Sequence, residues 1–494
     1  MSDSRLIVVS NRLPVSIEPS ADGYKVTASS GGLVTALDSV LRKYSGVWIG
    51  HAGEGNNARI ARLLELASID HSYKIEPVTL SAEEIAGFYY GYSNEIVWPL
   101  FHDLQSRCNF DPEYWSAYCS VNRRFAEATS TFMKGDDFVW VHDYHFALVG
   151  RYLRERTSGG GIGFFQHIPF PPPDIFEKLP WRAAMLEGML AYDVLGFQTD
   201  RDQRNFLACV RTIVPRVGVV QRPNGFHLHH RKHCARIAVF PVSIDFHEFA
   251  DVAARDDVTA KVRRLRQEQQ GRKIILGVDR LDYTKGIVER LRAFRHLLRN
   301  WPGMKRAVTL LQLVVPSRED IPKYRELKEE VERLVSEING EFSDAGWVPV
   351  HYFYRQLERE ELIVHYRAAD IALVTPLKDG MNLVSKEYCA AQVGETGALV
   401  LSEFAGSAAQ LGPGALLVNP NDQQAIAEAL VQACQMPVTE RIWRMGLLRR
   451  FLRQNDVYDW AESFLDAGRN MIDDSCLTAG NAAMSSVEPS GRTC

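Results

Sequence analysis

The sequence predicts an α/β protein made of two Rossmann-like halves. Short apolar runs alternate with longer amphipathic segments along most of the 494 residues, which is typical of parallel sheets covered by helices. A chain of this length is too long for one hydrophobic core, so two domains are expected. The apolar runs form two groups, one ending near residue 245 and the other beginning near residue 271. Two comparable halves joined by a hinge suggest a cleft between them.

In the first half, strands are expected where apolar residues follow one another without interruption, as in buried parallel strands. These runs are residues 6–9, 46–49, 138–141, 162–166, 194–198 and 235–240. Residues 24–27 are also strand-like, and a glycine-rich loop follows them.

The second half repeats this alternation. Its expected strands are residues 273–278, 309–315, 348–353, 371–375 and 398–402, and its expected helices include 257–270, 287–298 and 323–339. A last helical segment, 457–472, follows a complete second half, so we expect it to cross back to the first. We therefore predict an N-terminal domain of residues 1–245, a C-terminal domain of 246–456, a returning helix within 457–476 and a disordered tail at 477–494.

The composition is that of an ordinary globular enzyme, with 46% hydrophobic and 24% charged residues. A net charge of −4 gives no indication of a nucleic-acid partner. No run approaches the roughly 18 apolar residues of a membrane span, and no signal peptide is apparent, so we expect a cytoplasmic protein. The eight cysteines are scattered and never form Cys-x-x-Cys, which favours reduced thiols.

Residues 370–388 contain a strand, a polar loop and a helix in close succession. Pro376 and Gly380 end the apolar run, and helical spacing begins near Asn382, with Lys386 and Glu387 in the first turns. This order directs backbone N–H groups toward an anion at the carboxyl end of the sheet. An ordinary strand-to-helix turn is equally compatible with the spacing alone.

A second strand-to-helix loop carries two cations, Arg280 and Lys285. Two positive charges at such a loop suit a diphosphate leaving group, whose negative charge grows as a glycosidic bond breaks. The alternative is that these cations form surface ion pairs with Asp279 and Asp282, which an isolated Arg-x-x-x-x-Lys pattern favours.

Together, the two loops resemble the trehalose-6-phosphate synthase family, which is glycosyltransferase family 20. The resemblance is carried by Arg-Leu-Asp-Tyr-Thr-Lys-Gly at 280–286 and by Thr-Pro-Leu-Lys-Asp-Gly-Met-Asn-Leu-Val-Ser-Lys-Glu at 375–387. It extends from about residue 6 to 464 and includes the blocks 9–14, 29–33, 94–99, 140–145, 167–171, 195–199, 402–406 and 418–420. It implies a retaining glycosyltransferase with the GT-B fold, in which two Rossmann-like domains face each other.

The resemblance also implies a donor site for a nucleotide diphosphate glucose. Arg280 and Lys285 would hold the diphosphate, Glu387 would bind the ribose, and Asp379 would contact glucose hydroxyls. The implied donor-binding residues are Gly32, His167, Arg280, Lys285, Asp379, Gly380, Met381, Asn382, Leu383, Val384 and Glu387. The base is not determined by these residues, although uridine is the commonest in the family.

The implied acceptor site binds glucose 6-phosphate. Arg12 and Arg318 would hold its phosphate, because a guanidinium group can bind such a dianion through two hydrogen bonds. Tyr89, Trp98 and Asp143 match positions that contact the acceptor sugar. Considered without the resemblance, Tyr89 and Trp98 are more typical of core packing.

The implied reaction transfers glucose with retention, and Arg280, Lys285, Asp143 and His167 are the expected catalytic residues. No convincing carboxylate nucleophile is present, so catalysis would rest on positioning and on neutralising the diphosphate. No metal or other cofactor is implied. A histidine-rich stretch at 227–233 has spacing that could bind a metal, but the cationic residues within it oppose this.

Two alternatives remain. A glucosylglycerol-phosphate synthase would use the same donor with glycerol 3-phosphate as acceptor, and residues 174–182 resemble that relative. A regulatory homologue would only bind sugar phosphates, but such proteins are expected to lose donor-site residues that are present here. The expected partners are small molecules, with neither nucleic acid nor membrane. A homo-oligomer is possible, and a separate phosphatase would act on the product.

Overall fold

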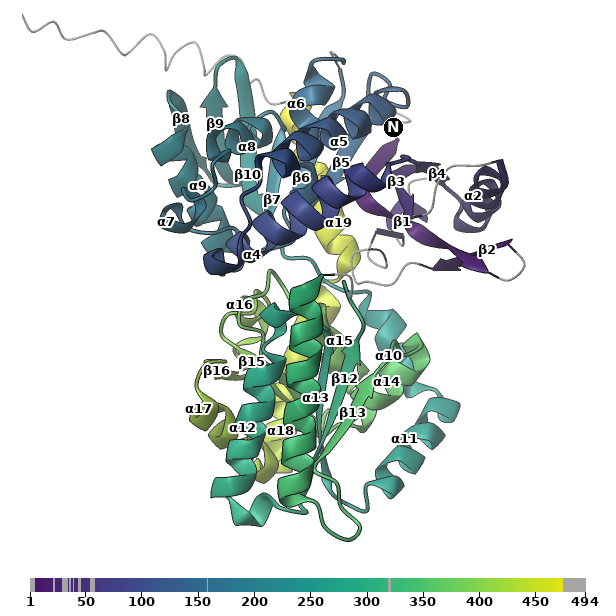
Figure 1. Cartoon of the computed structure of the whole chain (residues 1–494), viewed down its shortest axis with the longest axis vertical. Coiled ribbons are helices and arrows are strands. Elements are labelled where there is room, and N and C mark those ends of the chain that lie inside the picture. Colours follow the sequence, from purple (N-terminus) through teal and green to yellow (C-terminus); the bar gives the residue numbers. More distant parts are fainter. Residues whose placement is uncertain are drawn as a thin grey trace, which may run out of the picture. The chain divides into compact units, whose positions relative to one another are not determined.

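The computed structural model describes residues 5–20, 23–28, 46–53, 58–157, 159–318 and 321–473, together with 34, 37, 38 and 40–42. The chain separates into two compact units, which Figure 1 shows. Unit 1 is Met1–Pro241 with Tyr458–Cys494, and unit 2 is Val242–Val457. Gly32, in the predicted glycine-rich loop, and the tail predicted to be disordered at 477–494 lie outside the described residues.

Unit 1 contains one large sheet. Its strands are β1 (Leu6–Ser20), β2 (Gly23–Ala28), β3 (Val47–Gly53), β4 (Lys74–Pro77), β5 (Phe138–His142), β6 (Gly161–Phe165), β7 (Val194–Phe197), β8 (Val217–Arg222), β9 (Gly225–His230) and β10 (His233–Val239). Within the described residues the order is β4-β3-β1-β5-β6-β7-β10-β9-β8, with β2 beside β1. The neighbours from β4 to β10 pair in parallel, whereas β2, β8 and β9 join by antiparallel pairing.

The first strand is longer than its apolar run predicts. Residues 6–9 are the buried parallel part, but β1 continues to Ser20 because its second half pairs with β2. This pairing satisfies backbone groups in a stretch whose side chains do not show the pattern of a buried strand. Arg12 therefore lies within β1 rather than in a loop after it.

The helices of unit 1 include an unusual π-helical segment, η1, between two short α-helices. The helical elements are α2 (Ala58–His71), α3 (Ala82–Glu84), η1 (Ile85–Val97), α4 (Trp98–Phe101), η2 (Gln105–Arg107), α5 (Pro112–Ser130), η3 (Tyr144–Phe146), α6 (Val149–Arg154), α7 (Pro173–Phe176), α8 (Arg182–Met189), α9 (Asp200–Ile213) and α19 (Val457–Asp473).

Helix α19 contributes to the core of unit 1, although it follows unit 2 in the sequence. The buried Phe464 ring stacks on Trp140 with centroids 4.7 Å apart and meets Phe240 edge to face at 5.2 Å. The strands leave room for this ring, since a Cβ added at Gly163 or Gly196 would lie within 2.9 Å of it. The C-terminal helix is thus packed against the centre of the sheet.

Unit 2 contains a wholly parallel sheet. Its strands are β11 (Lys273–Arg280), β12 (Val308–Val315), β13 (Val350–Tyr354), β14 (Ile371–Val374), β15 (Ala398–Ser402) and β16 (Leu416–Val418). Within the described residues their order is β13-β12-β11-β14-β15-β16, so the direction of winding reverses between β11 and β14. Open α/β sheets bind ligands at the carboxyl ends of the strands beside such a reversal.

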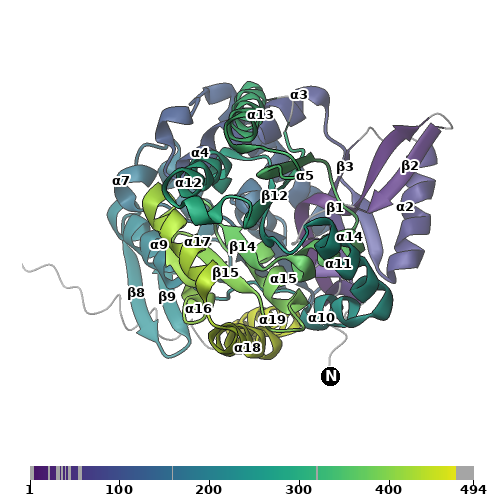
Figure 2. The same ribbon diagram turned by 90° about the horizontal axis from the view of Figure 1, so that it is seen from below.

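Helices cover both faces of the unit 2 sheet, and each face has its own apolar cluster (Figure 2). One face carries α12 (Ile287–Asn300), α13 (Pro322–Phe342) and α17 (Gln423–Gln435). The other carries α10 (Phe246–Ala254), α11 (Asp256–Glu268), α14 (Arg359–Ala368), α15 (Leu383–Ala391) and α18 (Val438–Gln454). The remaining short helices are η4 (Tyr283–Lys285), η5 (Pro302–Met304) and α16 (Ala408–Leu411).

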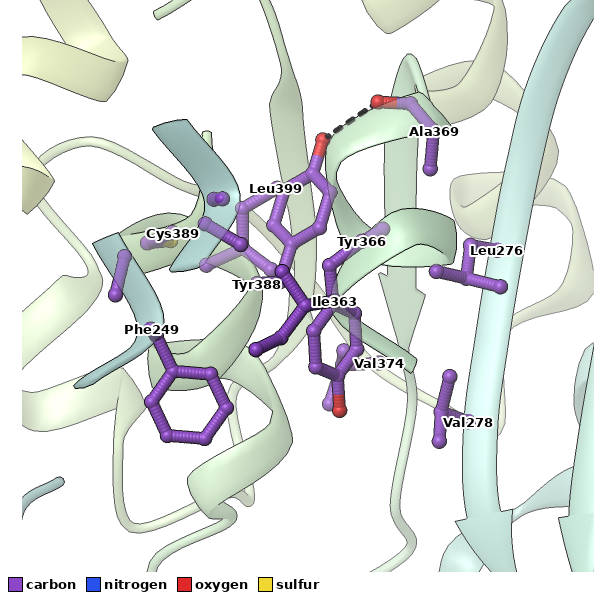
Figure 3. Packing of buried hydrophobic residues seen from close by; sticks show 14 of the residues in the cluster. Phe249, Leu276, Val278, Ile363, Tyr366, Ala369, Val374, Tyr388, Cys389 and Leu399 are labelled. Atoms are coloured by element: carbon purple, nitrogen blue, oxygen red, sulfur yellow. Dashed lines mark hydrogen bonds between the residues drawn. The ribbon is translucent and has the colours of Figure 1, made fainter. Parts of the chain in front are cut away.

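The apolar cluster beneath α14 and α15 includes two buried tyrosines, shown in Figure 3. The hydroxyl of Tyr388 donates to the carbonyl of Ala369 at 3.5 Å, while Tyr366 extends its hydroxyl in another direction. Strand β13 begins at Val350 rather than at 348 as predicted, since Val348 is 43% exposed and Pro349 cannot donate to the ladder. Across the ranges described, no helix is long and apolar enough to cross a membrane.

Removing the Phe464 ring should destabilise unit 1. Phe464→Ala would leave a cavity among Trp140, Phe165 and Phe240, at a cost of about 3–5 kcal/mol. Urea unfolding followed by tryptophan fluorescence should show an earlier transition. Trp443→Ala, which removes a 58% exposed aromatic ring, is the control and should change stability by only about 0.5 kcal/mol. Equal shifts for the two variants would contradict the role of α19.

Candidate active site

The two sequence motifs of unit 2 meet at the carboxyl ends of β11 and β14. Lys285 lies in η4, after β11, and its Nζ is 2.6 Å from Oδ2 of Asp379, in the loop after β14. The side-chain amide of Asn382 donates to the same oxygen at 3.1 Å. Arg280 is the exposed last residue of β11. The loops that sequence analysis singled out separately therefore share one ion pair.

The predicted alternative, surface pairing of Arg280 and Lys285 with Asp279 and Asp282, is wrong. Both acids are buried, with 5% and 1% of their surface exposed. Asp279 forms an ion pair with Arg290, and Asp282 accepts a hydrogen bond from Arg318 at 3.1 Å. The two acids therefore support the loop from beneath, and Lys285 is paired with Asp379.

Burial affects the pKa of each acid differently. For Asp279, burial raises the pKa and outweighs the opposing effect of Arg290. For Asp282, burial also raises the pKa, but Arg318, Lys285 and the backbone N–H of Thr284 together outweigh it, and the pKa is lowered. The negative charge of Asp282 is thus stabilised beneath the exposed cationic side of the loop.

Arg290 links three adjacent strands beneath this site. Its guanidinium group is fully buried and bonds to Asp279 on β11, to Gln312 on β12 at 3.2 Å and to Thr375 after β14 at 3.0 Å. It also donates to the carbonyl of Lys285 at 3.4 Å. Sequence analysis missed this residue, because an arginine on an amphipathic helix is ordinarily exposed. Its position holds the backbone that carries Lys285.

Two glycines allow the loops to approach each other. Gly286 has φ +63°, and a Cβ there would lie 2.2 Å from the carbonyl oxygen of Thr375. A Cβ at Gly406 would lie 1.8 Å from the carbonyl oxygen of Gly380. The backbone N–H of Leu377 donates to Thr284 at 2.8 Å, which joins the loops directly. Any larger residue at either glycine would force the loops apart.

Helix α15 begins in the geometry that the sequence predicts for anion binding. Asn382 caps it with φ +76°, and its side chain accepts the N–H of Ser385 at 3.1 Å. The helix starts at Leu383, so its first N–H groups lack intrahelical acceptors. Met381 is buried and Val384 is partly buried. Gly380 and its neighbours are held by the loop after β15, since Ser407 donates its N–H to Met381 at 2.8 Å.

Glu387 lies one turn further along α15. Its carboxylate accepts a hydrogen bond from Tyr366 at 2.7 Å, and burial raises its pKa more than this bond lowers it. The partly buried carboxylate therefore has a fixed orientation near the helix start.

The neighbouring Lys386 is fully buried, and its Nζ donates to the carbonyl of Val242 at 2.7 Å. Burial lowers its pKa from 10.5 to about 7. Val242 is the first residue of unit 2 in the sequence, so this bond ties α15 to the segment where the chain enters the unit.

Arg318 belongs to unit 2, whereas the other predicted acceptor residues belong to unit 1. Its side chain is only 7% exposed and bonds to Asp282 and to the hydroxyl of Tyr324. Its φ of +52° is unfavourable for a side chain of this size. Such strain is often found at functional positions, where the surrounding contacts maintain it.

In unit 1, Arg12 and Tyr89 lie together at the surface. The guanidinium of Arg12 is 5.7 Å from the centre of the Tyr89 ring and donates to its hydroxyl at 3.4 Å. Tyr89 lies in η1 and stacks on His145 with centroids 6.0 Å apart. The π-helical turn and β1 thus bring two predicted acceptor residues into contact. Trp98, by contrast, is only 5% exposed and packs against His102 and Tyr144.

Asp143 and His167 follow the adjacent strands β5 and β6. The Oδ1 of Asp143 accepts the backbone N–H of His167 at 3.1 Å, and Asp143 has φ +74°. The Nε2 of His167 is 3.0 Å from Nδ1 of His142, a residue that sequence analysis did not identify. Burial lowers the pKa of His167 to about 3. Its ring is therefore neutral at physiological pH.

The histidine-rich stretch forms the hairpin of β9 and β10. Cys234 lies 3.9 Å from His227 and 4.0 Å from His229. Even so, the described residues contain no group of three or more His, Cys, Asp or Glu that could hold a metal ion.

The sequence is similar to known proteins along almost its whole length. The model of the family described as "Glycosyltransferase family 20" matches residues 4–469. A trehalose-6-phosphate synthase of Mycobacterium avium is 42% identical over 481 residues, which cover 94% of this chain and 95% of that protein.

Two solved structures are also similar. An α,α-trehalose-phosphate synthase (UDP-forming) from Burkholderia xenovorans, in complex with glucose-6-phosphate, has a TM-score of 0.85 at 33% identity and covers 95% of this chain and 100% of its own. A structure described as trehalose-6-phosphate from E. coli bound with UDP-2-fluoro glucose has a TM-score of 0.84 at 34% identity, covering 94% and 98%.

The buried Lys386 should make stability depend on pH. Its pKa is lowered from 10.5 to about 7, so between these values the unfolded chain holds a proton that the folded chain has released. Stability rises with pH wherever the unfolded state binds more protons. In urea unfolding between pH 7 and 10, wild type should therefore gain stability relative to Lys386→Met as the pH rises.

Lys178→Met is the matched control, because this exposed lysine also donates to a backbone carbonyl, that of Asp174. The change with pH for Lys386→Met should exceed the change for this exposed variant over the same pH range. A constant difference between wild type and Lys386→Met would contradict the lowered pKa.

Proposed function

The chain belongs to glycosyltransferase family 20, and we propose that it transfers glucose from UDP-glucose to glucose 6-phosphate, producing α,α-trehalose 6-phosphate and UDP. The observation that carries this proposal is the contact of Lys285 with Asp379 at the point where the winding of the unit 2 sheet reverses. Cationic and hydroxyl-binding groups there match what a nucleotide diphosphate sugar requires. The substrates of the related proteins favour the same assignment.

On the donor side, Arg280 and Lys285 bind the diphosphate. Lys285 is paired with Asp379, and a diphosphate would draw the ammonium group away and let the carboxylate accept bonds from glucose hydroxyls. The backbone from Gly380 to Val384 lies at the start of α15, where N–H groups stabilise phosphate. Glu387, oriented by Tyr366, is suited to a ribose hydroxyl.

On the acceptor side, Arg12 and Tyr89 supply a cation and a hydroxyl group that are already in contact. Arg12 binds the phosphate of glucose 6-phosphate, and Asp143 accepts a hydrogen bond from an acceptor hydroxyl. Trp98 supports this region by packing on Tyr144. In unit 2, Arg318 is fixed by Asp282 and Tyr324 and supplies a second guanidinium group suited to a phosphate.

We further propose that the reaction retains the anomeric configuration. Asp143 of unit 1 and Asp379 of unit 2 are each assigned to binding sugar hydroxyls, so neither is assigned as a nucleophile. The leaving phosphate oxygen instead takes the proton of the incoming hydroxyl on the same face of the sugar. Arg280 and Lys285 then stabilise the charge that develops on the diphosphate. The reaction takes place in the cytoplasm, and a separate phosphatase removes the product phosphate.

A matrix of substrates tests the proposed function. UDP-, ADP- and GDP-glucose would each be combined with glucose 6-phosphate and with glycerol 3-phosphate, and nucleotide release and product mass would be measured. We expect the highest rate for UDP-glucose with glucose 6-phosphate, and an α,α-linked product by NMR. Product formation only from glycerol 3-phosphate would identify a glucosylglycerol-phosphate synthase instead. Binding of sugar phosphates without any turnover would identify a regulatory protein.

Removing the Lys285 ammonium group should impair the chemical step. Lys285→Ala is expected to lower kcat by about 10²–10³-fold, the usual effect of losing one group that stabilises developing charge. Steady-state kinetics with both substrates saturating would measure this change. Lys328→Ala, which alters a lysine paired with Glu332 on the surface of α13, should retain wild-type kcat. Near-normal turnover by Lys285→Ala would disprove the assignment of this residue.

A further inference from the structure

We propose that His142 is a positioning residue that fixes the tautomer of His167. In this arrangement Nδ1–H of His142 donates to Nε2 of His167, so His167 carries its own proton on Nδ1. His167 then presents an N–H group, rather than a lone pair, to a ligand oxygen. Only the identity of that ligand, the donor sugar, rests on the proposed function.

The two rings must share a single hydrogen between them. Nδ1 of His142 and Nε2 of His167 are 3.0 Å apart, which is a hydrogen-bond distance. Burial and the neighbouring His167 lower the pKa of His142 well below its usual value, and burial lowers that of His167 to about 3. Both imidazoles are therefore neutral, so one nitrogen donates and the other accepts.

The surroundings of His142 indicate which nitrogen donates. His142 is 1% exposed, and its Nε2 is buried without a hydrogen-bond partner in the described part of the chain. The Trp140 and Trp460 rings lie 4.7 and 6.5 Å away, and their indole nitrogens, which are also buried and unpaired, can only donate.

A hydrogen on Nε2 of His142 would thus be a buried donor without an acceptor among the described residues, and the neighbouring indole N–H groups cannot accept it. A lone pair on Nε2 avoids adding a third unpaired N–H group to those of Trp140 and Trp460. The proton of His142 consequently lies on Nδ1 and points toward His167.

This assignment decides what His167 can do. Its Nε2 is the acceptor from His142, and its backbone N–H is bonded to Asp143, so the ring is held from two sides. Its Nδ1 has no hydrogen-bond partner among the residues that the structure describes, and it is not one of the enclosed polar atoms. A neutral Nδ1–H suits a hydroxyl oxygen as acceptor and cannot take a proton as a general base.

NMR can test the tautomer directly on the full-length protein without substrate. Protein labelled with ¹⁵N-histidine would be studied by long-range ¹H–¹⁵N correlation, and the His167 signals would be assigned by their loss in His167→Asn. We expect a pyrrole-type Nδ1 and a pyridine-type Nε2 for His167. The reverse pattern, or a charged ring at neutral pH, would overturn the proposal. The spectrum needs no turnover, so it stands independently of the proposed function.

Two variants separate the hydrogen bond from ring packing. His142→Phe keeps an aromatic ring but cannot donate, whereas His142→Asn keeps a donor near the position of Nδ1. We expect the Phe variant to give mixed His167 tautomers and a KM for the nucleotide sugar roughly three- to tenfold higher, the scale of one hydrogen bond. The Asn variant should restore the Nδ1–H pattern and most of the affinity. An unchanged His167 spectrum in His142→Phe would overturn the role of His142.

Discussion

The buried guanidinium group of Arg290 is the interaction on which the proposed donor site depends most. It joins β11, β12 and the end of β14 and also holds the carbonyl of Lys285. A buried cation is tolerated only when it is paired and hydrogen-bonded, and breaking such a pair costs about 3–5 kcal/mol. The guanidinium group therefore holds the ends of these three strands together. The same bonds position the loops that follow the strands.

Polar contacts and close backbone packing also position the loops after β11, β14 and β15. Gly286 and Gly406 have no side chains that would push neighbouring loops apart. The Lys285–Asp379 ion pair joins the loop after β11 to the loop after β14. Asn382 adopts a positive φ to cap α15, and Asp143 and Arg318 carry similar strain. Surrounding hydrogen bonds compensate for the strain, so the groups that we propose to bind substrate are held in fixed orientations.

Much of the fold could be predicted from hydrophobic pattern, because buried parallel strands have long apolar runs between amphipathic helices. The full length of β1 could not, since residues 15–20 form a strand through tertiary pairing, along their whole length with β2 and at Ile17 also with β3. The π-helix that carries Tyr89 also lacks a sequence signal. Among the site residues, the resemblance supplied Lys285 and Asp379, but it could not reveal that they bond to each other. Arg290 was missed because an arginine on an amphipathic helix is ordinarily exposed, whereas this one is fully buried.

The sequence by itself determined the alternation of strands and helices, the two halves, and the residue types available for phosphate and sugar binding. These follow from local pattern and motif, which need no knowledge of distant neighbours. Only the tertiary structure decided which charges pair: Asp279 with Arg290, Asp282 with Arg318, and Lys285 with Asp379. The pairing of His142 with His167 was decided in the same way. The partners of each pair come from different strands, helices or loops. Burial, which sets the protonation state, depends on how those elements pack.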